Sequence, residues 1–116
     1  MQNIMDFVFY RDQSSASTSA DMKTYFNTQA DMMSVEVSGT ATSCKINIQG
    51  RTNSENNNEW FDLTVMNMTN LDIGTDIEGN GIYEVAIEGM REIRANIVSV
   101  SGGSVTVFGR AVNTGV

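Results

Sequence analysis

The sequence predicts an all-β protein, a single antiparallel β-sandwich of about seven to eight strands with a jelly-roll or immunoglobulin-like topology. Apolar and polar residues alternate in several short runs, and turn residues separate these runs at intervals of roughly 8 to 12 residues. Valine and isoleucine supply most of the aliphatic side chains, whereas leucine occurs only at Leu63 and Leu71. β-Branched side chains favour a pleated sheet. The length of 116 residues fits one domain.

The chain divides into three segments within this domain: an N-terminal strand or docking arm (1–10), a flexible polar connection (11–30) and the β-sandwich (31–116). Ile4–Tyr10 is aromatic and β-branched, which indicates a strand. Two interpretations stay open for it: an edge strand of the sandwich, or a segment that docks on a neighbouring copy or another protein. The side chains expected to dock are Met5, Phe7, Phe9 and Tyr10.

Two strictly alternating runs, Met33–Gly39 and Cys44–Gly50, predict half-buried strands. The turn between them predicts that they pair as a hairpin. A polar loop follows at Arg51–Glu59. The next run, Trp60–Met66, has apolar residues on both faces, which indicates a strand covered on both sides or one that contains a bulge.

The remaining elements depend on the same signals of alternation and turn residues. They are a short strand at Leu71–Ile73, a tight turn at Gly79–Gly81, alternating strands at Ile82–Glu88 and Glu92–Ser101, a hairpin turn at Gly102–Gly103 and a closing strand from Val105.

Composition excludes several classes of function. Fourteen acidic residues stand against seven basic ones, a formal charge of −7, so no nucleic-acid partner is expected. No apolar run approaches the roughly 20 residues that span a bilayer, and the acidity disfavours an anionic membrane surface, so no membrane partner is expected. The N-terminus lacks the features of a secretion signal, which predicts synthesis in a cytoplasm.

The chemistry of catalysis is nearly absent from the sequence. There is no histidine to act as a base, and the single cysteine, Cys44, falls on the apolar face of a strand and is expected to be buried. Asp62, Glu84 and Glu88 are acids on strand-like segments, as glycoside hydrolysis would need. Alternation places Glu84 and Glu88 on a solvated face instead, so we expect no enzyme and no cofactor.

A weak calcium candidate lies at Asp72, Asp76 and Glu78, because carboxylates are the ligands that calcium prefers. An EF-hand is excluded, since Ile87 occupies the position of the closing carboxylate and the flanking segments alternate as strands. No metal site is therefore expected, apart from this loose set of three acids.

The order of motifs from Met33 to Val112 resembles small β-sandwich virion proteins of tailed bacteriophages and prophages, namely capsid decoration, head-fibre or related minor structural proteins. The shared pattern is "VEVSGT", "KINIQGR", a polar loop before "EWFDL", and then "GNGIYEVAIEGMREIRANIVSVSGGSVTVFGR". The resemblance implies a structural or attachment role in the virion, often as an oligomer, and no catalysis.

Two hypotheses of function follow from these observations. The first is a non-enzymatic virion protein, made in the bacterial host cytoplasm, that contacts copies of itself, with a trimer as one option, and other virion proteins. The alternative is a carbohydrate-binding module of a host-attachment apparatus that binds a host-surface glycan. In that module Trp60, Tyr83 or Phe61 would stack on a sugar, while Arg51 and Asn56, Asn57 and Asn58 would bind its hydroxyls. For Trp60 itself, the neighbouring apolar residues favour a core anchor over a ligand contact.

Overall fold

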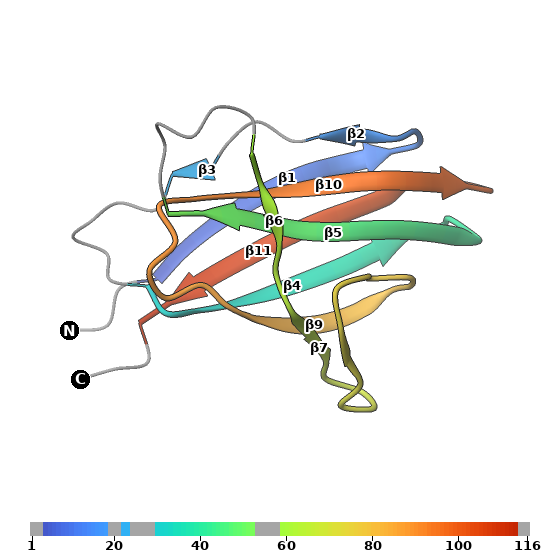
Figure 1. Cartoon of the computed structure of the whole chain (residues 1–116). Helices are drawn as coiled ribbons and strands as arrows, with labels where there is room; N and C mark the ends of the chain where they lie inside the picture. The colour runs from blue at the N-terminus through green and yellow to red at the C-terminus, as the bar shows by residue number, and fades with distance from the viewer. Residues whose placement is uncertain (1–3, 19–21, 24–29, 53–58, 114–116) are drawn as a thin grey trace.

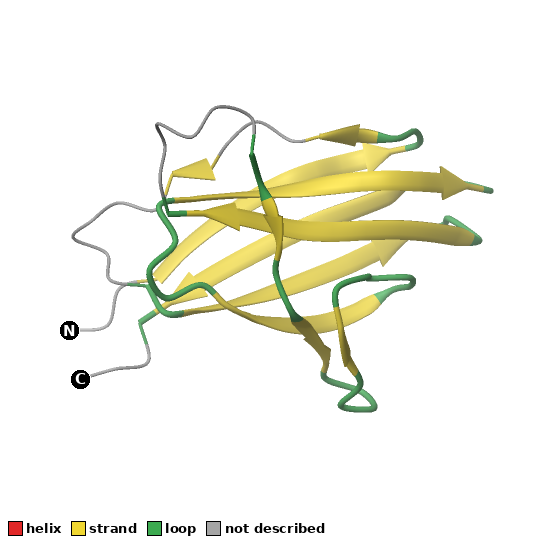
Figure 2. Ribbon diagram, viewed as in Figure 1, coloured by secondary structure: helices red, strands yellow, loops and turns green. Residues whose placement is uncertain are grey.

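The computed structural model describes residues 4–18, 22–23, 30–52 and 59–113, and every regular element in these ranges is a β-strand (Figure 2). Within the same ranges, no helix is long and apolar enough to cross a membrane. The strands in chain order are β1 (Ile4–Gln13), β2 (Ser17–Thr18), β3 (Met22–Lys23), β4 (Met32–Gly39), β5 (Ser43–Arg51), β6 (Phe61–Asp62), β7 (Val65–Asn67), β8 (Ile73–Gly74), β9 (Gly81–Ala86), β10 (Glu92–Ser101) and β11 (Val105–Val112).

The strands form two antiparallel sheets that pack face to face, which confirms the predicted sandwich. The six-stranded sheet has the order β1-β11-β4-β9-β7-β8. The five-stranded sheet has the order β2-β10-β5-β6, and β3 also pairs with β10. In Figure 1 the long strands β10 and β5 lie in front of β11 and β4. The strands outnumber the prediction because β2, β3, β6 and β8 have only two residues each, too short to show alternation.

The core lies between the two sheets and follows the alternation of the sequence. Met33 and Val35 of β4 face Ile46 and Ile48 of the opposite sheet, and all four are completely buried. Cys44 is buried as predicted. Val37 continues the series on β4, and the other strands contribute inward side chains with the same period: Tyr83, Val85, Ile93, Ala95, Ile97, Val105 and Val107.

β1 is an edge strand of the protein's own sandwich, paired with β11 along its length. Phe9 and Tyr10 are both buried, because a register shift between Val8 and Tyr10 interrupts the alternation and directs both rings inward. Met5 and Phe7 pack against the core as well. Met5, Phe7, Phe9 and Tyr10 therefore pack against their own core, which is the edge-strand interpretation of this segment.

The segment predicted as a flexible connection is partly strand. β1 continues to Gln13, and the short strands β2 and β3 both pair with β10. The serine-rich sequence shows no alternation that would predict β2 and β3, because these strands are ordered by pairing with β10 and not by an apolar face of their own.

The two predicted hairpins are wrong. β4 pairs with β11 and β9, whereas β5 pairs with β10 and β6, so β4 and β5 lie in different sheets. β10 and β11 likewise lie in different sheets. The connection from β4 to β5 and the connection from β10 to β11 both cross between the sheets, and they lie side by side. Backbone bonds join the two crossings: Thr40 and Ala41 donate to the carbonyl of Ser104, and Thr42 donates to that of Ser101. Each connection therefore pairs with the other.

The run Trp60–Met66 is also divided between the sheets, which explains its apolar residues on both faces. β6 pairs with β5 of one sheet, and β7 pairs with β8 and β9 of the other. The short strand expected at Leu71–Ile73 occurs at β8 instead, because Leu71 adopts a φ of 65° in the turn before it.

Candidate functional site

The outer face of the five-stranded sheet is polar and contains the best-defined constellation of functional side chains. Three pairs of residues face each other across β5 and β10: Arg51 with Glu92, Gln49 with Arg94, and Asn47 with Asn96. The pairs extend to the edge strands. Thr18 of β2 donates a hydrogen bond to Asn96 at 2.9 Å, and Gln49 donates one to Asp62 of β6 at 2.9 Å.

Trp60 lies at one end of this face, against two arginines. The guanidinium carbons of Arg51 and Arg94 are 4.3 and 4.2 Å from the centre of its ring, within cation–π range. Arg51 forms a salt bridge to Glu92 at 2.8 Å, and Nε of Arg94 donates to Gln49 at 2.8 Å. We call Gln49, Arg51, Trp60, Glu92 and Arg94 the Trp60 cluster.

The salt bridge in the Trp60 cluster is nearly removed from water, with side-chain exposures of 11% for Arg51 and 3% for Glu92. Glu92 accepts from both Nε and an Nη of Arg51, at 3.2 and 2.8 Å. Such paired bonds fix the plane of the guanidinium. The buried carboxylate of Glu92 therefore holds Arg51, one of the two arginines at Trp60, in one orientation.

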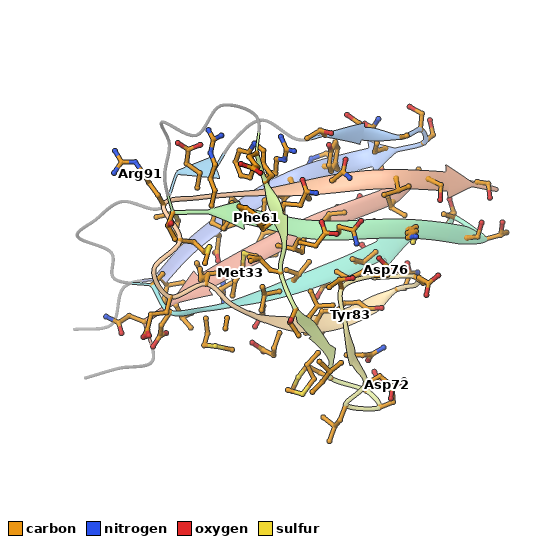
Figure 3. The ribbon with its side chains drawn as sticks, in the orientation of Figure 1. Met33, Phe61, Asp72, Asp76, Tyr83 and Arg91 are labelled. Carbon is orange, nitrogen blue, oxygen red and sulfur yellow. The ribbon has the colours of Figure 1, made fainter. Side chains whose placement is uncertain are left out.

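Trp60 is half-buried and is not part of the core, which corrects the expectation of a core anchor. Leu63 and Val65 further along the chain contact the core instead, because the chain crosses between the sheets after β6. Of the other aromatics proposed to stack on a sugar, Tyr83 is buried and Phe61 is exposed (Figure 3). The predicted ligand residues Asn56, Asn57 and Asn58 lie outside the described residues.

The sequence prediction missed Glu92 and Arg94. The signal that could have found them is the alternation of β10, since both residues occupy polar positions that alternate with the inward side chains Ile93 and Ala95. The pairing of β10 with β5, which places them beside Arg51, is not encoded in that local pattern.

The three candidate calcium ligands line one hollow of about 520 Å³ beside β7 and β8. Figure 3 shows Asp72 and Asp76 on the loops around it, and Tyr83, which also lines it, lies between them in this view. Asp76 accepts a hydrogen bond from Asn47 at 2.7 Å and pairs with Lys45 at 3.7 Å. Among the described residues, no three acidic side chains lie close enough together to hold a metal ion.

The carboxylates considered for glycoside hydrolysis do not converge. Asp62 lies on the outer face of the five-stranded sheet, where Gln49 binds it. Glu84 lies on the outer face of the six-stranded sheet and accepts from Ser34 at 2.8 Å. The core separates these two acids, and Glu88 is exposed in the turn after β9. They cannot flank one glycosidic bond.

The buried thiol of Cys44 has no activating neighbour among the described residues. Burial raises its pKa, and the charge of Glu78 raises it further. Burial likewise raises the pKa of Tyr83, whose hydroxyl donates to the carbonyl of Gly79 at 2.8 Å. Both groups are therefore neutral near pH 7, as packed core side chains are.

The outer face of the six-stranded sheet carries rows of apolar side chains. One row crosses β1, β11, β4 and β9, and its register partners are, in that order, Val8, Phe108, Glu36 and Ile82. In a second row Ile4 pairs with Val112, followed by Met32 and Ala86. Between them runs a polar row with an ion pair of Arg110 and Asp6 at 2.7 Å. We call the first two rows the apolar rows.

Comparisons with known proteins agree with this architecture. The model of the XepA family matches residues 3–111 of the chain. The solved structure of the SPBc2 prophage-derived protein YomS superposes with a TM-score of 0.82 and 24% identity over 97% of this chain and 96% of that one. The PBSX exported protein XepA superposes with a TM-score of 0.86 and 26% identity over 97% of this chain. The match spans only 38% of the XepA chain. No curated protein matches the sequence.

Proposed function

The chain belongs to the XepA family, and on this premise we propose that it is a non-enzymatic structural protein of a phage or prophage. Its sandwich is shared with YomS, which is derived from a prophage, and with XepA, which is exported. The separation of Asp62 and Glu84 on opposite outer faces supports a role without catalysis.

The observation that carries the proposal is the pair of apolar rows on the outer face of the six-stranded sheet. Ile4 is 56% exposed, Val8 40% and Ile82 47%. The five-stranded sheet instead pairs polar residues across β5 and β10, with Val98 and Phe61 as its exposed large apolar side chains among the described residues. An apolar surface on one side of a soluble sandwich marks a contact surface with another protein.

A second copy of the same chain is the partner we propose for the apolar rows. The polar row between them supports this choice, because Arg110 and Asp6 offer both signs of charge on one surface. A surface that presents both signs can pair with itself, as a symmetric homo-oligomer requires.

Within the virion we propose a capsid decoration, head-fibre or minor structural component that mediates assembly or surface attachment. The fold supports this finer role only through its compactness and its one-sided apolar surface. The virion is the proposed location, and it is compatible with the exported character of XepA.

The test is the molar mass in solution, measured by light scattering for the wild type and two matched variants. Val8→Asp places a charge in the apolar rows, and Val98→Asp places the same charge at a valine of similar exposure, 45%, on β10 of the other sheet. We expect an oligomer for the wild type and Val98→Asp, and a 12.7 kDa monomer for Val8→Asp.

Circular dichroism establishes that both variants remain folded. Deletion of the first strand is a poorer test, because it removes Phe9 and Tyr10 from the core. A monomeric wild type, or a folded Val8→Asp variant that keeps the oligomeric mass, contradicts the assembly through the apolar rows.

A further inference from the structure

The chain concentrates arginine and its one tryptophan at a single end of the five-stranded sheet. Trp60 lies over the guanidinium groups of Arg51 and Arg94, and the backbone N–H of Arg91 donates to the carbonyl of Arg51. Figure 3 shows Arg91 projecting from this end of the sheet. Three of the chain's arginines are thus gathered at one end of one sheet.

Charges of both signs lie along this face, since Lys45 pairs with Asp76 and Asp62 of β6 accepts from Gln49, whereas the Trp60 cluster itself has two arginines and one acid, Glu92. β5 and β10 together carry three basic residues, Lys45, Arg51 and Arg94, and one acid, Glu92. The chain as a whole has seven basic and fourteen acidic residues, so four basic and thirteen acidic residues lie elsewhere. The local excess of positive charge in the Trp60 cluster attracts anions to this end of the sheet.

We propose that the Trp60 cluster binds an anionic glycan, a saccharide whose rings carry carboxylate or phosphate groups. Guanidinium groups recognise both anions through paired N–H bonds. The half-buried indole offers an apolar surface on which a sugar ring stacks. Gln49 and Asn96 continue along the face with partly exposed amides of the kind that bind hydroxyl groups.

The cluster is organised before any ligand arrives. The buried carboxylate of Glu92 fixes Arg51, Gln49 fixes Arg94 through Nε, and the ring of Trp60 covers both guanidinium carbons. A site whose side chains are already held loses little entropy on binding. This proposal is independent of assembly through the apolar rows, which lie on the opposite sheet, so either can fail without the other.

Titration with trigalacturonate tests the proposal directly. The fluorescence of Trp60 reports on the cluster alone, because the chain has one tryptophan, and calorimetry supplies an independent affinity. We expect trigalacturonate to bind and to change the fluorescence. We expect its methyl ester, which has the same rings without charge, to bind at least about tenfold more weakly, as the loss of a charge-assisted hydrogen bond predicts.

A matched pair of variants places the binding on this face. Arg94→Gln removes one guanidinium beneath Trp60, and Arg11→Gln removes an exposed arginine from β1 of the opposite sheet. We expect Arg94→Gln to lower the affinity about tenfold or more while Arg11→Gln leaves it unchanged. Light scattering shows whether the oligomeric mass is the same in both variants, which separates this proposal from the assembly.

Three further probes decide the class of ligand. Glucose 1-phosphate, compared with glucose, shows whether a phosphate on the sugar serves as well as a carboxylate. Inorganic phosphate that binds as tightly as trigalacturonate would indicate a site for bare anions, and a short oligothymidylate that binds equally well would indicate a general polyanion surface. Either result overturns the proposal, as does the absence of binding by both charged sugars.

Discussion

The ring of Phe7 lies directly over the backbone of Gly109, its register partner across the edge of the six-stranded sheet. A Cβ atom at Gly109 would be 2.6 Å from Cε2 of Phe7 and 2.9 Å from Cε2 of Phe9. The two rings meet edge to face, with centres 5.2 Å apart. Because Gly109 has no side chain, both rings pack against its backbone, and this contact helps to attach β1 to the sheet.

Gly109→Ala is therefore expected to destabilise the protein by about 1–3 kcal/mol, because the added methyl group forces the packed rings aside. Thermal unfolding followed by circular dichroism measures the effect. Gly74→Ala is the matched control, since a Cβ there meets nothing within 4 Å. Equal melting temperatures for the two variants would show that the rings move freely.

Glu92→Ala is expected to cost on the order of 3–5 kcal/mol, because it removes the carboxylate that compensates the buried charge of Arg51. Urea unfolding measures the free energy. Asp6→Ala breaks the exposed pair with Arg110 instead and should leave the unfolding midpoint unchanged within error. A small effect for Glu92→Ala would mean that water reaches Arg51 readily.

The carboxyl group of Asp6 is expected to titrate below the ordinary range of aspartate. The hydrogen bonds from Arg110 lower its pKa, and the charge of Arg110 adds to this effect while desolvation opposes it. Because the folded pKa is the lower one, the stabilisation is present above the unfolded pKa and is lost as pH falls through the folded pKa. Carbon-detected NMR measures the titration, and Arg110→Gln should return the pKa to its usual value.

The fluorescence of Trp60 is expected to be quenched more by iodide than by caesium. A half-buried indole is accessible to small quenchers, and the neighbouring guanidinium groups attract the anion and repel the cation. Stern–Volmer plots at low ionic strength give both constants. A blue-shifted emission that resists both ions would place Trp60 in the core and contradict the structure.

The alternation of the sequence predicted the inward side chains correctly, because the period of a strand is a local property. Val35, Ile46 and Val85 are buried as predicted. Strand partners were not predictable in the same way: the turn after β4 has the composition of a hairpin, yet it crosses between the sheets because its hydrogen bonds go to Ser101 and Ser104. Those residues are some 60 positions away in the chain.

In the candidate site, too, the residues that pair across strands could not be predicted from the local sequence. The sequence singled out Arg51 and Trp60 from their place in and beside a polar loop, but their neighbours Glu92 and Arg94 come from another strand, on which Glu92 lies 41 positions after Arg51. The burial of Tyr10 beside Phe9 was unpredictable for a local reason instead. The register shift at Tyr10 reverses the side of one ring, and a bulge leaves no mark in an aromatic run.

The pairing of the first long strand with the last has a consequence for synthesis on the ribosome. Ile4 and Val112 are register partners, so β1 leaves the ribosome long before the strand that completes it. Until β11 has been synthesised, the rings of Phe7 and Phe9 cannot pack against Gly109, so they lack this native contact in the nascent chain. β1 can therefore complete its pairing only after β11 has left the ribosome, and a chaperone that binds short aromatic segments would find its target in β1 until then.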